Sequence, residues 1–327
     1  MLEARYMHTA SILNNGKVLV AGGSNSYGYF NTAELYDPTT GLWTRTGNMS
    51  IGRFYHTAST LSNGMVLVAG GRDSDGWTKN STELYDSATG LWIPTGNMNS
   101  LRCYHTASTL SNGMILVVGG YDFNGWASSA ELYDPATGLW TPTGNMTITR
   151  QHHTASILNN GKVLVVGGYG LNNNVLNGAE LYDPTTGLWT PTGNMTITRQ
   201  HHTASVLNNG KVLVVGGNGR DDILNSAELY DPTTGLWTQT GNMNIGRLLH
   251  TASTLSNGKV LVAGGFDSYG LSTNTELYDP ATGLWTPTAN MTTGRWCPTA
   301  SILNNGKVLI VGGGSLSNIS NSAEIYG

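Results

Sequence analysis

The chain contains few of the residues that mark several common classes of protein. Only 11% of its 327 residues are charged, the formal net charge is -4 and no basic run occurs, so no nucleic-acid partner is predicted. Apolar runs are short, for example 163–166, far below the length of a membrane-spanning helix, so no membrane partner is predicted either. No segment shows a helical period, which leaves an all-β chain.

Glycine, in contrast, is abundant, and the doublet Gly-Gly recurs at a regular interval. The doublets begin at Gly22, Gly70, Gly119, Gly167, Gly216, Gly264 and Gly312, in steps of 48 or 49 residues. A unit of this length cannot bury both faces of its own strands, so copies must stack, and this period is typical of propeller blades. We therefore predict one closed domain over residues 1–327, with seven repeats of about 48 residues. The only cysteines, Cys103 and Cys297, then lie too far apart for a disulfide, so we expect two free thiols.

Repeat four illustrates the four strands expected in each blade. The predicted strands span residues 154–158, 162–166, 179–183 and 188–192. The dipeptide Asn160-Gly161 predicts a two-residue type I′ hairpin between the first two strands. The second run has no polar face, so neighbouring blades should cover it on both sides. Pro191 places the fourth strand at the outer edge, because proline cannot donate to a ladder.

Four features of the repeat together resemble the kelch motif. In repeat one they are Gly22-Gly23, Tyr36 in the next strand, Trp43 seven residues later, and Arg53 past the fourth strand. The resemblance covers essentially the whole chain and implies a seven-bladed kelch-type β-propeller with four-stranded blades, with ligands held by loops at one end of the central channel. Kelch propellers serve as adaptor, actin-binding and scaffold modules and as the frame of copper-radical oxidases, so the fold does not assign a function.

The number of strands is uneven. Strands one to three occur seven times, but the fourth strand occurs six times, with Trp43, Trp92, Trp140, Trp189, Trp237 and Trp285. The last blade is therefore predicted to have three strands, with unpaired backbone groups along residues 322–326. We favour a monomer with a solvated edge over an edge-paired dimer.

The repeats differ mainly in the loop after Gly-Gly and the loop after the fourth strand. Alternating strand direction brings both loops to one end of the propeller. Trp77 and Trp126 lie among polar residues of the first loop, which suits peptide or sugar recognition, although packing on neighbouring loops is an alternative. At the channel mouth, between the repeat arginine and the next strand, we predict the ligand-binding residues Tyr6, Phe54, Tyr55, Tyr104, His152, His201 and Trp296.

Ionisable residues mostly follow the repeat. The arginines are Arg5, Arg53, Arg102, Arg150, Arg199, Arg247 and Arg295, and the glutamates are Glu34, Glu83, Glu131, Glu180, Glu228, Glu276 and Glu324. Equal numbers at fixed positions favour internal ion pairs or arginine bonds to backbone carbonyls over an anion-binding ring. Six histidines also share one position. A cluster of His152, His153, His201 and His202 could in principle bind copper or zinc, but strand-capping roles are favoured, so no metal or cofactor is predicted.

A catalytic site needs unlike groups that converge on one point, and here nearly every ionisable group belongs to the repeat. A copper-radical oxidase also needs a cross-linked cysteine and tyrosine, whereas Cys103 and Tyr104 are adjacent in sequence. We therefore predict a non-enzymatic binding or scaffold propeller that recognises a protein or glycan through its variable loop face. One alternative is the propeller part of a carbohydrate-active or copper-dependent oxidase-like enzyme that lacks its other domain. Another is a structural, self-assembling repeat protein.

Overall fold

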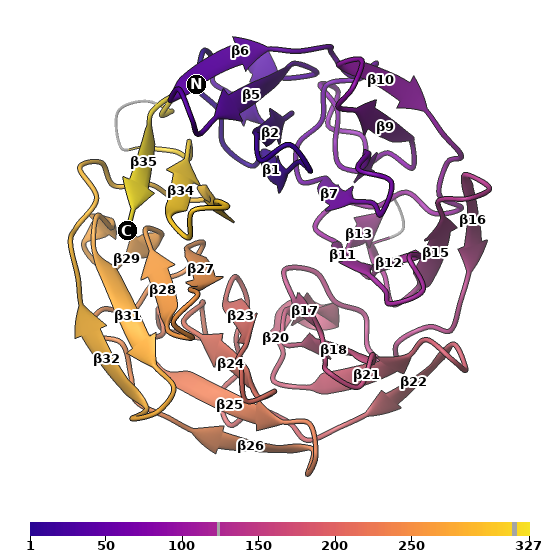
Figure 1. Cartoon of the computed structure of the whole chain (residues 1–327). Helices are drawn as coiled ribbons and strands as arrows, with labels where there is room; N and C mark the ends of the chain where they lie inside the picture. Colours follow the sequence, from indigo (N-terminus) through magenta and orange to yellow (C-terminus); the bar gives the residue numbers. More distant parts are fainter. Residues whose placement is uncertain (123–124, 316–318) are drawn as a thin grey trace.

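Seven β-sheets surround a central channel in the computed structural model, which describes residues 1–122, 125–315 and 319–327 (Figure 1). Six sheets have four antiparallel strands, and the seventh, β33-β34-β35, has three. The all-β, seven-bladed propeller with a three-stranded last blade is therefore confirmed. Within the described residues, no helix is long and apolar enough to cross a bilayer.

The strands occupy equivalent places in successive blades. The innermost are β1 (Thr9–Ile12), β7 (Thr57–Thr60), β11 (Thr106–Thr109), β17 (Thr154–Ile157), β23 (Thr203–Val206), β27 (Thr251–Thr254) and β33 (Thr299–Ile302). The second strands are β2 (Val18–Ala21), β8 (Val66–Ala69), β12 (Ile115–Val118), β18 (Val163–Val166), β24 (Val212–Val215), β28 (Val260–Ala263) and β34 (Val308–Val311). The third strands are β5 (Ala33–Asp37), β9 (Thr82–Asp86), β15 (Ala130–Asp134), β21 (Ala179–Asp183), β25 (Ala227–Asp231), β31 (Thr275–Asp279) and β35 (Ala323–Tyr326).

The fourth strands form the rim of the ring (Figure 1). They are β6 (Leu42–Arg45), β10 (Leu91–Pro94), β16 (Leu139–Pro142), β22 (Leu188–Pro191), β26 (Leu236–Gln239) and β32 (Leu284–Pro287). Short hairpins in the loops pair β3 (Ser24–Asn25) with β4 (Gly28–Tyr29), β13 (Tyr121–Asp122) with β14 (Gly125–Trp126), β19 (Tyr169–Gly170) with β20 (Asn174–Val175), and β29 (Phe266–Asp267) with β30 (Gly270–Leu271).

Residue types follow the taper of the blades. The innermost strands, such as β17, consist mainly of small residues because neighbouring blades crowd around the channel. Every residue of β18 is buried, since sheets on both sides cover it. Strand β22 lies at the rim and exposes three of its four residues, including Pro191, which an outer edge tolerates. The four strands predicted for repeat four are confirmed, with each end within one residue.

The turn between the first two strands differs from the predicted type I′ hairpin. The N–H of Gly161 donates to the carbonyl oxygen of Leu158 at 2.9 Å, and the N–H of Lys162 donates to Asn160 Oδ1 at 3.1 Å. Gly161 has a φ of 80°, whereas Asn160 does not enter the left-handed region. The connection is therefore a type I turn followed by a left-handed glycine. The predicted turn type was wrong because Asn160 contributes its side-chain oxygen rather than a positive φ.

The ring closes through the contacts that join the other blades. His8 Nε2 lies 2.9 Å from Thr299 Oγ1, and a histidine–threonine bond of 2.9–3.1 Å joins five further pairs of blades. The N–H of Gly313 donates to the carbonyl oxygen of Arg5 at 3.0 Å, as the second glycine of each other doublet does to the next repeat arginine. Side chains of blades one and seven also share a buried apolar cluster. Closure therefore does not require a blade shared between the two termini.

Each repeat arginine is buried and holds its own blade together. In repeat four, Arg150 Nη2 donates to Glu180 Oε1 at 2.9 Å. Its Nη1 donates to the carbonyl oxygens of Gly167 at 3.0 Å and Gly178 at 2.9 Å. Glu180 Oε2 also accepts the N–H of Thr147 at 2.7 Å. The arginine–glutamate pair occurs in all seven repeats, so the predicted internal ion pairs and carbonyl bonds are both confirmed.

Candidate functional site

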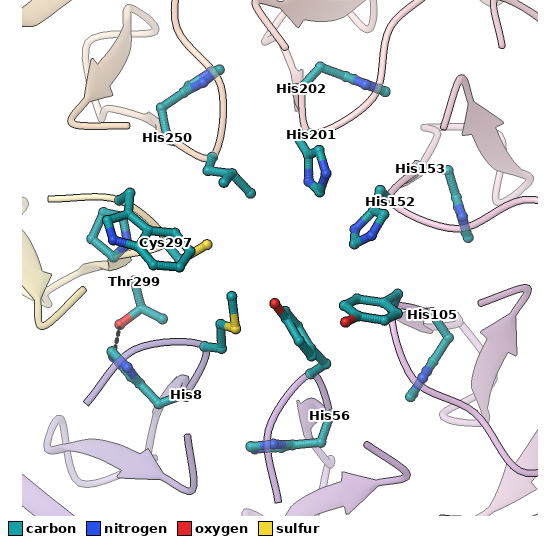
Figure 2. Close-up of a pocket in the computed structure, with 16 residues that line it drawn as sticks. His8, His56, His105, His152, His153, His201, His202, His250, Cys297 and Thr299 are labelled. Carbon is teal, nitrogen blue, oxygen red and sulfur yellow. Dashed lines mark hydrogen bonds between the residues drawn. The ribbon is translucent and has the colours of Figure 1, made fainter. Parts of the chain in front are cut away.

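A cavity of about 570 Å³ lies on the channel axis. It lies at the end of the propeller where the two variable loops meet, because Phe54 pairs with Arg72 and Trp296 with Gly314 across those loops. Figure 2 shows His152 and His201 close to the middle of the cavity, with His153 and His202 farther from it. The variable residues therefore surround a concave site, as binding sites usually require. We call this end of the propeller the mouth end.

Seven residues at one repeat position line the cavity and share an unusual backbone. This mouth ring consists of Met7, Tyr55, Tyr104, His152, His201, Leu249 and Cys297, and every φ lies between 50° and 56°. A left-handed conformation costs a non-glycine residue about 1 kcal/mol or more. No member is glycine or asparagine, the residues that adopt this conformation most readily. The fold therefore holds seven side chains in the cavity against their backbone preference.

Hydrogen bonds between neighbouring blades keep the mouth ring in place. The backbone N–H of a ring member donates to the carbonyl oxygen of the member in the preceding blade at 3.0–3.3 Å. These donors are Tyr104, His201, Leu249 and Cys297. The strained backbone is thus fixed by the arrangement of the blades rather than by the local sequence.

The mouth ring is chemically asymmetric. Tyr55, Tyr104, His152 and His201 form a continuous arc in which neighbouring ring centroids are 4.0, 4.4 and 4.0 Å apart. Hydroxyl and imidazole groups can donate and accept hydrogen bonds along this arc. The other side of the cavity is formed by Met7, Leu249, Trp296, Cys297 and Pro298. One half of the cavity is therefore suited to hydrogen bonding and the other to apolar contact.

The cavity carries no formal charge near pH 7. Its lining residues include no aspartate, glutamate, lysine or arginine. Burial lowers the pKa of His201 to about 4, and burial together with the neighbouring His201 lowers the pKa of His152 well below its usual range. Burial also raises the pKa of the Cys297 thiol to about 12. Imidazoles and thiol are therefore neutral, so a charged ligand group would find no counter-ion among the lining residues.

The six repeat histidines form a second, outer ring of buried side chains: His8, His56, His105, His153, His202 and His250. Each bonds a threonine of the preceding blade, as His153 Nε2 does with Thr106 Oγ1 at 3.1 Å. Burial lowers the pKa of His153 to about 3. A structural role is confirmed, but the histidines join adjacent blades rather than cap their own strands.

Three other predicted binding residues precede the mouth ring by one position. Trp296 lines the cavity and packs against Tyr6, with ring centroids 5.1 Å apart. Phe54 lies between Tyr29 and Tyr55, with centroids 4.7 and 4.8 Å away, and does not line the cavity. Tyr6 is likewise absent from the lining, so it and Phe54 support the ring from outside.

The two predicted loop tryptophans lie outside the cavity. Trp77 is 56% exposed, and its backbone N–H donates to Asp73 Oδ1 at 3.0 Å. Trp126 is half-buried, with its ring centroid 6.1 Å from Tyr121 and 6.2 Å from Tyr169. The structure therefore brings Tyr55, Tyr104, His152, His201 and Trp296 together at the cavity but not these two residues.

Three residues absent from the predicted binding set line the cavity, and Arg72 lies behind Tyr104 without lining it. Met7, Leu249 and Cys297 complete the mouth ring, and their shared repeat position was sufficient to identify them. Arg72 stands 5.3 Å from the ring centroid of Tyr104 and 5.5 Å from that of Tyr121. No repeat pattern marks Arg72, because it lies in a variable loop.

Comparisons with known proteins agree on the fold. The KLHDC2/KLHL20/DRC7 Kelch-repeats domain matches residues 139–314, and the Kelch motif matches residues 4–50 and 102–147. No curated protein matches the sequence. Among solved structures, a fungal alcohol oxidase of the AA5 family in complex with copper is similar, with a TM-score of 0.81 and 23% identity over 99% of this chain and 74% of that chain. At this identity the similarity shows the fold alone.

Among the described residues, histidine, cysteine and carboxylate side chains do not gather into a metal-binding group at the cavity. Copper requires several donors that converge on one point. Within residues 1–122, 125–315 and 319–327, no group of three or more histidine, cysteine, aspartate or glutamate side chains is arranged to hold a metal ion. The sulfur of Cys103 contacts the carbonyl oxygen of Tyr121 at 3.5 Å and does not line the cavity.

Proposed function

Because the chain belongs to the kelch-repeat family, we propose that it is a non-enzymatic binding propeller that recognises a protein or glycan at the mouth end. The fold supports a binding or scaffold role in general, and the finer assignment rests on the cavity. A cavity on the axis is reached by residues from all seven blades, so one ligand group can contact several repeats at once.

The backbone of the mouth ring carries this proposal. Strained residues persist where the surrounding structure enforces them, and they concentrate at ligand sites. All seven ring members keep some exposed surface at the cavity, even though Tyr55 stacks on Tyr104 at 4.0 Å and His152 on His201 at 4.0 Å. A ligand that contacts this surface would give the strained residues a function.

The neutral, two-sided cavity defines the chemistry of the ligand group. The tyrosine and histidine arc offers aromatic faces next to hydrogen-bonding atoms, a combination suited to a sugar ring or an uncharged peptide side chain. The apolar side would cover the opposite face of that group. A carboxylate or ammonium group placed in the cavity would lose hydration without a charged partner among the lining residues.

Glycine substitutions test the proposal directly. The protein is first applied to glycan and peptide arrays, and hits are measured by titration against the double variant Tyr104→Gly/His152→Gly. Because both positions already have φ near 55°, glycine removes side chains without backbone strain. We expect at least tenfold weaker binding, with a Tm equal to or above that of the unchanged protein. Thr185→Ala, in a turn at the opposite end, should bind normally.

Unchanged affinity in the double variant would place the ligand elsewhere. A fall in Tm of more than about 5 °C would instead show that the mouth ring is a structural plug. A protein that binds nothing on either array would favour the self-assembling alternative.

A further inference from the structure

Three crevices open at the end of the propeller opposite the mouth. They lie at the joints between blades seven and one, four and five, and five and six, with volumes of about 260, 410 and 260 Å³. At each joint, the turn between the first two strands of one blade meets the same turn of the next blade and the turn that follows its third strand. This size suits a small group such as a single sugar ring rather than a drug-sized ligand.

An asparagine of the preceding blade reaches across each of these joints. A Cβ added to the turn glycine of the next blade would lie 2.9–3.0 Å from the side-chain nitrogen of this asparagine. Where Ser62 and Ser111 take its place, a Cβ on the next turn glycine, Gly113 or Gly161, would meet nothing within 4 Å. The longer side chain therefore brings an amide group onto the neighbouring blade. The three asparagines are Asn159, Asn208 and Asn304.

A lysine of the following blade accompanies the asparagine at these joints. Lys17, Lys211 and Lys259 pair with the last aspartate of the third strand, with Nζ 3.1–3.2 Å from Oδ2. Blades two and three have Met65 and Met114 at the lysine position. Among the seven joints, the sequence combines this asparagine with this lysine at three, and the three crevices lie there. The crevices therefore coincide with a particular pair of residues rather than with the repeat as a whole.

Each crevice offers hydrogen-bonding groups of both kinds without a net charge. The three asparagines are exposed, and in the described part of the chain their side chains make no hydrogen bond to protein. In the crevice between blades four and five, Asp231 Oδ1 accepts the N–H and the hydroxyl of Thr233, and its Oδ2 lies 3.2 Å from Lys211 Nζ. The ammonium and carboxylate neutralise each other, while the amide can donate and accept. A charged ligand group therefore gains little there, whereas hydroxyl groups can bond to each of these side chains.

A proline ring adds an apolar surface to each crevice. It belongs to Pro38, Pro232 or Pro280, which follows the aspartate in the turn. Sugar rings present hydroxyl groups at their edges and C–H groups on their faces. An apolar surface beside a few polar groups is the usual composition of a small-molecule site. The lining thus fits a sugar ring better than a peptide side chain, which carries at most one hydroxyl group.

We propose that the three crevices bind uncharged sugar residues of a glycan chain, separately from the mouth. Two crevices lie at successive joints, on either side of blade five, so a chain of repeating residues can contact both. Each open crevice alone binds weakly, but the second contact of one chain is intramolecular and raises the overall affinity. The crevice between blades seven and one gives a further point of contact.

Affinity electrophoresis tests the proposal. Mobility is compared between plain native gels and gels that contain mannan, dextran, galactan or xyloglucan as neutral probes, or polygalacturonate or chitosan as charged ones. We expect retardation by at least one neutral polysaccharide. The triple variant Asn159→Ser/Asn208→Ser/Asn304→Ser should bind that polysaccharide at least tenfold more weakly, because the contacts in all three crevices are altered. Its Tm should be unchanged, since serine occupies this position in repeats two, three and six.

Further variants copy residues that the chain already uses at other joints. Lys17→Met/Lys211→Met/Lys259→Met reproduces Met65 of blade two and should weaken binding to a similar extent, which gives a second measure if the asparagine variant does not fold. Asn14→Ser makes the same change as the asparagine variant, but at the joint where Met65 replaces the lysine. It should therefore be retarded like the unchanged protein.

The mouth variant Tyr104→Gly/His152→Gly separates this site from the cavity and should also be retarded normally. Its loss of retardation would overturn the proposal while leaving the function proposed for the mouth intact. Absence of retardation by every neutral polysaccharide, or retardation by the charged ones alone, would overturn it as well. So would unchanged retardation of either triple variant, or an equal loss in Asn14→Ser.

Discussion

The two ends of the propeller are built from the same repeat but are constrained differently. At the end opposite the mouth, which we call the turn end, a Cβ added to Gly161 would meet nothing within 4 Å. At the mouth end, a Cβ added to Gly167 would lie 2.6 Å from the carbonyl oxygen of Arg199 and 2.8 Å from His202 Cε1. At other turns of the turn end, the nearest atoms belong to side chains that can move, such as Asn14 Nδ2 at 2.6 Å from a Cβ on Gly64, whereas at the mouth end they include backbone carbonyl oxygens. Sequence variation is therefore placed where the backbone beneath it is fixed most firmly.

Acidification should give the largest difference in stability between the two ends. Burial lowers the pKa of His8, His105, His153 and His250 to about 3, and those of His56 and His202 also fall well below normal. The unfolded chain binds these protons near pH 6.5 whereas the folded chain does not, so the free energy of unfolding falls as pH drops from about 6.5 toward 3. Each histidine contributes up to about 1.4 kcal/mol per pH unit in this range, and His152 and His201 act in the same direction.

Thermal unfolding between pH 7.5 and 5 measures this loss, and hydrogen exchange locates it. Exchange should accelerate first at the mouth end, which contains all the histidines. The variant His250→Pro, which copies Pro298 of repeat seven, should reduce the pH dependence by about one proton. A Tm that stays constant across this pH range would contradict the assignment of the histidines as buried and neutral.

Removal of one ion-pair partner should give the next largest effect. Glu180→Gln leaves the buried charge of Arg150 without its counter-ion and should lower the free energy of unfolding by about 3–5 kcal/mol in urea denaturation. Glu324→Gln should have a smaller effect, because the Glu324 side chain is 20% exposed. Lys162→Ala, which removes a surface pair at the turn end, should be indistinguishable from the unchanged protein. Equal losses for the two glutamate variants would show that burial does not govern these pairs.

Alanine substitutions at one glycine of each end should give the smallest difference in stability between the ends. Gly167→Ala should lower stability by about 3 kcal/mol, because a positive φ and close contacts act together. Gly161→Ala meets only the conformational penalty of its φ of 80° and should lower it by about 1 kcal/mol. Chemical denaturation of both variants shows which of them loses more stability. A reversed order would mean that the frame at the mouth end relaxes readily.

The repeating residues made much of the fold predictable. Strand positions, the three-stranded last blade and the arginine–glutamate pairs follow from side chains that meet the same environment seven times. The left-handed backbone of Tyr104 could not be predicted, since tyrosine gives no local sign of a positive φ and contacts between blades impose it. The positions of Trp77 and Trp126 outside the cavity were equally hidden, because they depend on loops that do not repeat.

Pro298 interrupts the circle of histidine–threonine bonds at a single joint. Thr251, which would accept a histidine there, instead lies 3.4 Å from the carbonyl oxygen of Ala263 in its own blade. The joint between blades six and seven therefore lacks this bond. Blade seven also lacks a fourth strand, and in complete blades the residue that follows this strand bonds the next blade, as Thr46 Oγ1 does with the hydroxyl of Tyr85 at 2.8 Å. Blade seven is thus held by fewer bonds at both of its joints. On heating, the ring would open first where the chain does not cross from blade seven to blade one, and the blades would stay connected as a curved row.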